Sequence, residues 1–149
     1  LRSADVVVEN FAARVIPNLG LEYGTLLEAN PSLIMLRMPS YGCNGPYSLY
    51  PGNGGTTEPM SGISSLLGYE DTPPLNSGVM HTDSFAGLMG FASLLIAIHH
   101  RSKTGQGQLI DLSQQETSIT LIANHVLDFT MNNRTTPRRA TRSTAPKPR

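Results

Sequence analysis

The sequence predicts an α/β fold built on a parallel sheet, and three observations support this prediction. Residues 5–11 and 33–38 are short runs of β-branched and other apolar residues, which are typical of strands buried on both faces. A short helical pattern at 22–29 lies between them, so that strand, helix and strand follow one another as in a βαβ unit. A third short strand is expected at 108–113, after the most apolar helical pattern of the chain at 85–100.

The first half of the chain is expected to join its two strands by short helical segments. A single helical turn is expected at 15–19. The helix at 22–29 ends at Asn30, because a proline pushes the residue before it out of the α region. From 39 to about 79 the sequence is rich in Gly, Pro, Ser, Thr and Asn, with one helical candidate at 60–68. A loop-rich stretch of this length is usually functional or connects subdomains.

The second half is expected to form two helices around the third strand. Thr82, Asp83 and Ser84 are candidate N-caps for the helix at 85–100, and Gly105 is a typical C-terminal stop. The capping-box spacing of Ser113 and Glu116 predicts a further helix that runs to about residue 131. Residues 132–149 are almost without apolar side chains, which favours a disordered segment or one laid over a partner.

Charge and cysteine content exclude several classes of protein. The 149 residues contain 11 acidic and 11 basic side chains, so the chain is no globally basic nucleic-acid binder. The six basic residues of 134–149 offset a net acidic charge in 1–133. The lone cysteine, Cys43, forms no internal disulfide, which favours a reducing, cytoplasmic location. The longest apolar stretch, within 85–98, is interrupted and too short to span a bilayer, so no membrane partner is expected.

Asp83 is the residue that stands out chemically. The sequence has no glycine-rich phosphate loop, no paired cysteines and no His-Glu-x-x-His pattern, so neither a nucleotide site nor a metal site is predicted. Asp83 lies between a glycine-rich loop and the first turn of the apolar helix, where backbone N–H groups and the helix dipole favour an ionised carboxylate. A carboxylate held there is either a helix cap or a nucleophile.

Several segments together resemble the family III CoA-transferases, which include formyl-CoA and carnitine CoA-transferases. The sequence Gly-Val-Met-His-Thr-Asp-Ser-Phe-Ala-Gly-Leu at 78–88, with the segments 100–108 and 110–113, resembles the central signature of that family. The segment 4–11 resembles the family's strand that ends in a CoA-contacting Asn-Phe pair. The resemblance covers most of residues 4–133, and the joint run of motifs is specific.

The resemblance implies a fragment of a Rossmann-like CoA-transferase family III fold. Residues 1–50 would form the end of a Rossmann-like CoA-binding domain. Residues 51–133 would form a loop-rich crossing and the helix that carries the catalytic aspartate. Residues 134–149 would form a basic connecting segment towards a second domain. We therefore expect the chain to be an internal piece of a longer protein.

The resemblance also assigns site residues and partners. It makes Asp83 the catalytic aspartate and places Asn10 and Phe11 in the CoA site. The family often has two arginines after the Asn-Phe pair; this chain lacks them, and Arg14 is the candidate for a phosphate contact. Acyl-CoA and a free carboxylic acid would be the substrates, with no tightly bound cofactor. Full-length relatives form interlocked homodimers, so an interlocked homodimer is expected.

The implied reaction moves CoA from an acyl-CoA thioester to a free carboxylic acid through aspartyl anhydride and aspartyl-CoA thioester intermediates. An aspartate held next to the thioester gains the effective molarity of an intramolecular nucleophile. The oxyanions formed need N–H donors, and the glycine-rich loops around Gly52, Gly54, Gly55 and Gly62 are candidates to supply them.

Two alternatives stay open. Acyl-CoA racemases of the same family need an Asp and a His as a base pair, and Asn53 stands in the loop after Pro-Gly where they have the histidine. His81 is then the only substitute, so a racemase is the second interpretation. The other alternative is a non-catalytic remnant in which Asp83 caps a helix. Glu58 is interpreted either as a substrate contact or as a solvated loop carboxylate.

Overall fold

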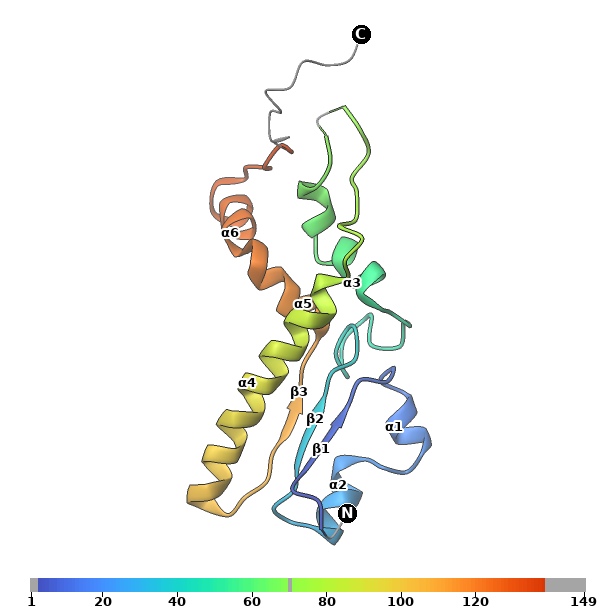
Figure 1. The fold of residues 1–149 in the computed structure, drawn as a ribbon, viewed down its shortest axis with the longest axis vertical. Helices are drawn as coiled ribbons and strands as arrows, with labels where there is room; N and C mark the ends of the chain where they lie inside the picture. Colours follow the sequence, from blue (N-terminus) through green and yellow to red (C-terminus); the bar gives the residue numbers. More distant parts are fainter. Residues whose placement is uncertain (1–2, 70, 139–149) are drawn as a thin grey trace.

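The computed structural model describes residues 3–69 and 71–138, and Figure 1 shows their arrangement. The strands are β1 (Val6–Glu9), β2 (Ile34–Arg37) and β3 (Leu109–Asp111). The α-helices are α1 (Val15–Asn18), α2 (Tyr23–Ala29), α3 (Gly54–Met60), α4 (His81–Thr104), α5 (Gln114–Ile119) and α6 (Ala123–Asn132). Two 3-10 helices complete the list, η1 (Ile63–Leu66) and η2 (Thr120–Ile122). Most of the basic segment 134–149 lies outside the described residues.

The strands form one parallel sheet in the order β1-β2-β3. Val7 pairs with Met35, and Leu36 pairs with Ile110. The central strand β2 is buried on both faces, as its unbroken apolar run predicts. The prediction of an α/β fold with a parallel sheet is therefore confirmed.

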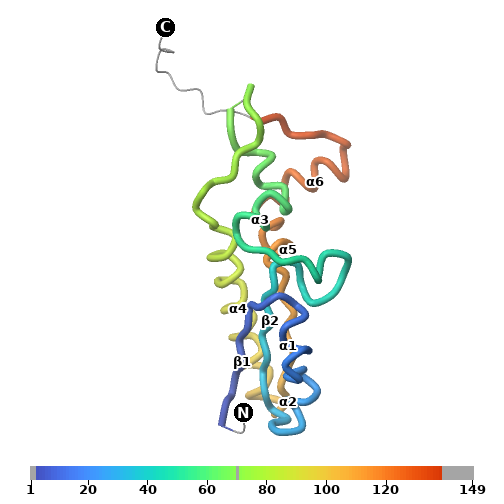
Figure 2. The backbone as a smooth tube through the Cα atoms, turned by 90° about the vertical axis from the view of Figure 1, so that its right-hand side faces the viewer, coloured from blue at the N-terminus to red at the C-terminus, as the bar shows by residue number. Residues whose placement is uncertain are grey.

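Helices cover both faces of this sheet (Figure 2). On one face lie α1 and α2, and on the other lies the long helix α4. Alternate residues of β2 point to the two sides, because successive side chains of a strand face opposite ways. The cluster under α1 and α2 contains Ile16, Leu26, Leu33 and Met35, and the cluster under α4 contains Leu36, Ala86 and Leu112.

Small residues bring α4 close to the sheet. A Cβ atom at Gly90 would lie 2.6 Å from the Sδ atom of Met38 and 3.1 Å from a methyl carbon of Leu36. The far end of the helix is tied to β1 by Arg101, whose guanidinium lies 3.1 Å from the carboxylate of Asp5. Gly105 ends the helix in the left-handed conformation, as the sequence predicts.

Two regions of the chain differ from the sequence predictions in their helices. The loop-rich stretch contains the unpredicted helix α3, which Asn53 caps by accepting a hydrogen bond from Gly55 N at 2.9 Å. The helix expected at 113–131 is divided into α5, η2 and α6. Its predicted start is confirmed, because the Ser113 hydroxyl accepts from Glu116 N at 3.2 Å.

Helix α4 is longer than the apolar pattern at 85–100 indicates. With 24 residues it is long and apolar enough, by length and composition alone, to cross a membrane. The prediction that the apolar stretch within 85–98 is too short to span a bilayer is therefore wrong for the helix that contains it. In the structure α4 packs on β2 and contacts α3 and α5. These contacts are those of a helix within an α/β domain.

Candidate functional site

A pocket of about 380 Å³ lies at the carboxyl ends of the three parallel strands. Asn10 follows β1, Met38 and Ser40 follow β2, and Gln114 begins the helix after β3. The first turns of α4 close the pocket with Asp83, Ala86 and Gly87, and the loop before α3 adds Gly52 and Asn53. In parallel α/β sheets, ligands bind in the crevice outside the carboxyl ends of the strands. Sheet topology therefore marks this pocket as the candidate active site.

Asp83 is the third residue of α4 and does not cap it. The N-cap position belongs to Met80, which adopts the left-handed conformation with φ of 50°. The interpretation of Asp83 as a helix cap is therefore wrong, and so is the prediction of a cap at Thr82 or Ser84. Within the described chain the Asp83 carboxylate accepts no hydrogen bond, and the residue is exposed to the pocket. It is a carboxylate in the first turn of α4 with no hydrogen-bond partner among the described residues.

Helix α3 holds the start of α4 in place. A Cβ atom at Gly54 would lie 2.7 Å from Asp83 Oδ2 and 2.6 Å from the Cβ of Met80, so no larger residue fits there. The buried hydroxyls of Thr57 and Thr82 are 2.9 Å apart and form a hydrogen bond between the two helices. The position of the Asp83 carboxylate is therefore set by a helix that is distant in sequence.

Glu58 is neither a solvated loop carboxylate nor a lining residue of this pocket. It is 1% exposed, and it accepts hydrogen bonds from the backbone N–H and the hydroxyl of Ser77 at 2.5 and 2.6 Å. Burial raises the pKa of Glu58, but the two Ser77 hydrogen bonds, the nearby His81 and a Ser64 hydroxyl outweigh it, so the net pKa is lowered. Both interpretations of Glu58 are corrected: it is a buried anchor for the loop that leads into α4.

His81 is partly exposed, contacts the same buried Glu58, and does not line the candidate pocket. Its Nδ1 lies 3.3 Å from a carboxylate oxygen of Glu58 and 3.1 Å from the Ser77 hydroxyl. The pocket wall at this end is formed by Asn53 and Asp83 instead. A base pair of Asp83 and His81 across this pocket has no support in the geometry.

Asn10 is the predicted CoA-site residue that the structure brings together with Asp83. A buried ion pair holds the turn that carries it: the Arg37 guanidinium lies 2.6 Å from the carboxylate of Glu9. The second Glu9 oxygen accepts from Phe11 N at 2.9 Å. Glu9 and Arg37 lie opposite each other at the ends of β1 and β2. This pairing follows from the strand register and is not visible in the sequence.

Phe11 and Arg14 lie outside the pocket wall. The Phe11 ring is 55% exposed. Arg14 is exposed as well, and its guanidinium donates to the carbonyl of Leu49 at 3.3 Å. Both residues are exposed, and neither lines the pocket together with Asp83.

Gln114 is a pocket residue that the sequence did not single out. It is 8% exposed and its Nε2 donates to the carbonyl of Met38 at 2.9 Å. Its Oε1 has no hydrogen-bond partner among the described residues. No sequence motif marks this glutamine, because its importance comes from the distant residues that surround it.

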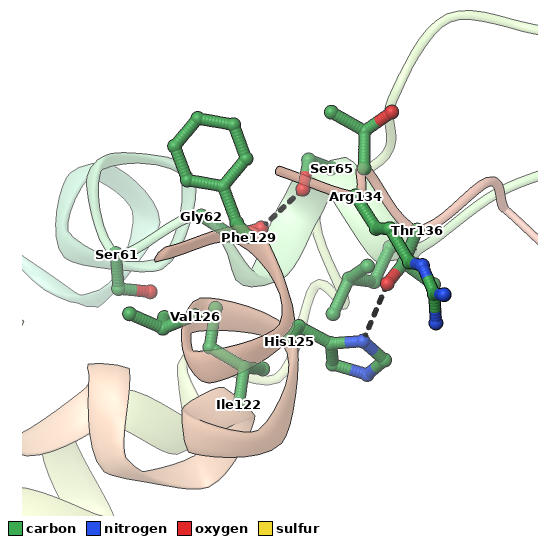
Figure 3. Close-up of a pocket in the computed structure, with 11 residues that line it drawn as sticks. Ser61, Gly62, Ser65, Ile122, His125, Val126, Phe129, Arg134 and Thr136 are labelled. Atoms are coloured by element: carbon green, nitrogen blue, oxygen red, sulfur yellow. Dashed lines mark hydrogen bonds between the residues drawn. The ribbon is translucent and has the colours of Figure 1, made fainter. Parts of the chain in front are cut away.

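A second pocket, of about 430 Å³, lies between η1 and α6 (Figure 3). It contains none of the predicted catalytic or CoA-binding residues. Gly62 lines this second pocket and not the first, so Gly62 is not positioned to supply an N–H donor next to Asp83. His125 from α6 lines it too and shares a hydrogen bond with Thr136 at 2.8 Å.

The described residues give little support to thiol chemistry at Cys43 or to a metal site. Burial, with a smaller effect of Asp111, raises the pKa of Cys43 to about 12, so this thiol stays protonated at neutral pH. In residues 3–69 and 71–138 no group of three His, Cys, Asp or Glu side chains is arranged to hold a metal ion.

Fold and pocket together define a ligand-binding α/β domain whose pocket contains one free carboxylate. A family model described as CoA-transferase family III matches residues 1–148. The chain belongs to CoA-transferase family III. It is 34% identical over 125 residues to a succinyl-CoA–D-citramalate CoA-transferase of Chloroflexus aurantiacus. It is 32% identical over 134 residues to a succinate–glutarate CoA-transferase of Agrobacterium fabrum.

Solved structures show the same fold. A CAIB/BAIF family protein from Brucella suis superposes with a TM-score of 0.85 at 32% identity, over 92% of this chain and 36% of that one. The protein Rv3272 of Mycobacterium tuberculosis superposes with a TM-score of 0.82 at 26% identity, over 88% of this chain and 36% of that one. The two curated relatives are matched over 84% and 90% of this chain, but over only 31% and 34% of their own lengths. The chain therefore spans about a third of the relatives it matches.

Proposed function

We propose that the protein carrying this chain transfers CoA from an acyl-CoA thioester to a free carboxylic acid, with Asp83 as the nucleophile. The observation that carries the proposal is the free carboxylate of Asp83 in a pocket at the carboxyl ends of the parallel strands. The names of the curated relatives, which are CoA-transferases for dicarboxylic or hydroxy acids, support it. We assign acyl-CoA and a carboxylic acid as the two substrates.

The proposed chemistry proceeds in steps that the carboxylate of Asp83 can perform. Asp83 attacks the thioester carbonyl, the C–S bond breaks, and a mixed anhydride and CoA thiolate form. The thiolate then attacks the aspartyl carbonyl, which releases the donor acid and leaves an aspartyl-CoA thioester. An incoming carboxylate reverses both steps and leaves as the new acyl-CoA. Holding the carboxylate in attacking geometry contributes roughly 7–11 kcal/mol to lowering the barrier.

The proposed CoA contacts follow the path out of the pocket. Asn10 lines the pocket with Asp83 and is assigned to the thioester end of CoA. Phe11 is next in sequence, and its exposed ring is available to pack against the pantetheine arm or the adenine. Arg14 has an exposed guanidinium that is available to a phosphate.

The oxyanions of the proposed reaction need N–H donors within the pocket. Gly52 and Asn53 line it, whereas Gly62 does not, so we assign this role to the loop before α3. Gly54 follows at the start of α3, whereas the N–H of Gly55 already donates to Asn53 Oδ1 and is not available to an oxyanion.

We also propose the domain organisation, assembly and location that the family resemblance implies. Residues 1–50 would complete a Rossmann-like domain, 51–133 would carry Asp83, and 134–149 would lead to a second domain. The whole protein would form an interlocked homodimer in the cytoplasm, with no membrane or nucleic-acid partner. The single cysteine and the balance of charges support this location.

The geometry favours the transferase over the racemase. A racemase needs a second base facing the substrate, but His81 is bound to Glu58 and Ser77 outside the pocket. Asn53, which does line the pocket, cannot exchange a proton at neutral pH. Among the described residues that line the pocket, Asp83 is the one carboxylate, and none is a histidine, lysine or cysteine.

The test is to trap the acylated aspartate in the full-length protein. Incubation with succinyl-CoA, followed by hydroxylamine and peptide mass spectrometry, should yield a hydroxamate at Asp83. Asp83→Asn should abolish the hydroxamate and lower transfer by at least about 10³-fold. The matched control is Asp71→Asn, an exposed loop carboxylate that should change neither.

Two outcomes would contradict the proposal. Transfer that persists in Asp83→Asn would exclude this aspartate as the nucleophile. Wash-in of solvent deuterium at the α-carbon of a branched acyl-CoA, without transfer to any acid, would indicate the racemase. An intact protein that neither transfers nor racemises would indicate the non-catalytic remnant.

A further inference from the structure

In the described chain, one end of the Gln114 amide forms a hydrogen bond and the other end forms none. Its Nε2 donates to the carbonyl of Met38 at 2.9 Å, which ties the first residue of α5 to the segment after β2. Its Oε1 is buried and has no hydrogen-bond partner in the part of the chain that the structure describes. Buried polar atoms are almost always paired, and Gln114 is a lining residue of the pocket, so this acceptor calls for a donor from outside the described chain.

The orientation of the Gln114 amide is fixed by its surroundings. If the group were rotated by 180°, Oε1 would face the carbonyl of Met38, and two acceptors would then lie in contact. The Nε2 end must therefore face Met38, and the free group is an acceptor. Its ligand must supply an N–H or O–H donor.

The rest of the pocket is neutral apart from Asp83. Apart from Gln114, its polar side chains are those of Asn10, Ser40 and Asn53, and no lysine or arginine lines it within the described residues. A carboxylate group of an acid substrate would find no cationic partner among the described residues of this wall. The pocket therefore fits a neutral, amide-containing part of a ligand better than the charged end of an acid.

We propose that Gln114 is a binding residue for acyl-CoA, and that its Oε1 accepts a hydrogen bond from the pantetheine amide nearest the thioester sulfur. The proposal rests on the proposed function. Two methylene carbons separate that amide nitrogen from the sulfur, so a thioester presented to Asp83 brings the amide into the same pocket as Gln114. The bond holds the arm and with it the thioester carbonyl in front of the carboxylate.

The test compares Gln114→Met in the full-length protein with wild type. Methionine keeps the length and the apolar packing of the glutamine side chain but removes the acceptor, and with it the Nε2 donor to the Met38 carbonyl. We expect the dissociation constant of acyl-CoA, measured by titration calorimetry, and its KM to rise about three- to tenfold, and the KM of the acid to stay unchanged. The matched control is Gln115→Met, because Gln115 donates to the carbonyl of Met60 and does not line the pocket.

A substrate analogue tests the bond itself. In acyl-CoA with an ester oxygen in place of that amide N–H, the donor is absent. Wild type should bind the analogue about three- to tenfold more weakly than acyl-CoA, whereas Gln114→Met should bind the two alike. An equal loss in both proteins would overturn the proposal. A change confined to the KM of the acid would overturn it too and would assign Gln114 to that substrate.

The proposed role of Gln114 and the proposed role of Asp83 can fail independently of each other. A hydroxamate at Asp83 together with unchanged acyl-CoA binding in Gln114→Met would leave the transferase intact and overturn the role of Gln114. Weakened acyl-CoA binding in Gln114→Met, without any acylation of Asp83 in wild type, would support the role of Gln114 and overturn Asp83 as the nucleophile. A melting temperature of Gln114→Met equal to that of wild type would show that weaker binding is not a loss of folding.

Discussion

At the scale of single residues, the candidate site depends on the unusual backbone at Met80. A non-glycine residue in the left-handed region costs about 1–3 kcal/mol and persists only where its surroundings impose it. Met80 precedes α4 with φ of 50°, and its Cβ faces Gly54. This turn places Asp83 in the first turn of the helix as a free group rather than at the cap. The strain and the free carboxylate therefore have the same structural origin.

Gly54→Ala is expected to displace the Asp83 carboxylate. The added methyl group would lie 2.7 Å from Asp83 Oδ2 and 2.6 Å from the Met80 Cβ, so the turn must shift. Transfer activity in the full-length protein should fall by at least tenfold, and stability by about 1–3 kcal/mol. Steady-state kinetics and thermal melting measure the two effects. Activity equal to wild type would show that the carboxylate needs no glycine beside it.

The pH dependence of stability should reveal the buried carboxylate of Glu58. Its pKa is lowered from the ordinary value of 4.5 in the folded protein, so folding favours the ionised form. The stabilisation is present above about pH 4.5 and is lost as the pH falls through the lower, folded-state pKa. Glu58→Gln should cost about 2 kcal/mol at pH 7 and less below pH 4. Urea denaturation at several pH values checks this.

Glu28→Gln is the control for this experiment, because Glu28 lies exposed on α2. Its replacement should change stability by less than about 0.5 kcal/mol at every pH. If Glu58→Gln behaves like this control, the hydrogen bonds from Ser77 contribute little, and the assignment of Glu58 as an anchor is wrong.

The sequence predicts a site residue only where the pattern that marks it lies within a short stretch of the chain. Asp83 was predicted because a carboxylate at the start of an apolar helix is visible in a short window. Gln114 and the pair Glu9–Arg37 were not, because their partners lie far away in sequence and meet only through the sheet. Glu58 was misread for the same reason, since nothing near it in sequence shows that it is buried.

At the scale of elements, α4 is defined by the small residues on its inner face. Ala86 and Ala97 are almost fully buried, and Gly90 lies against Leu36 and Met38. Apolar residues at helical spacing predicted the middle of this helix correctly. They did not predict its start, which Met80 sets, whereas Gly105 ends the helix as predicted.

Gly90→Ala and Gly24→Ala are expected to have opposite effects on stability. The methyl group at Gly90 would lie 2.6 Å from the Met38 Sδ, so α4 or Met38 must move and stability should fall by about 1–3 kcal/mol. Gly24 in α2 has open space around its Cβ position, and alanine there should stabilise the protein by about 0.5 kcal/mol. Chemical denaturation of both variants measures the difference, and equal effects would show that α4 is not packed tightly on β2.

The elements that the sequence did not predict are held by distant contacts. Helix α3 has glycines at its start and a proline near its end, which is a poor helical pattern, but Thr57 and Glu58 are buried by α4 and its preceding loop. The break between α5 and α6 occurs at Ile122, whose side chain faces the second pocket. Tertiary packing decides both features.

At the scale of the whole molecule, one face of α4 packs on the sheet and the other is unpaired. Leu88, Phe91, Leu95 and Ile96 are all more than half exposed on this outer face. The strands β1 and β3 each pair with β2 alone in the described sheet, so both edges of the sheet are open. Parallel sheets are normally covered on both faces and extended by further strands. These surfaces agree with a chain that spans about a third of its relatives.

We therefore expect the 149-residue chain, produced alone, to self-associate through the outer face of α4. Ile96→Lys, at a position that is 70% exposed, should reduce the association seen in sedimentation velocity. Leu19→Lys, at a loop position that is 61% exposed, is the control and should leave it unchanged. In the full-length protein Ile96→Lys should lower the melting temperature by several degrees, because a charge would then be buried under the rest of the protein. A chain that is monomeric at high concentration, or a full-length variant as stable as wild type, would show that this face is solvent-exposed in the working protein.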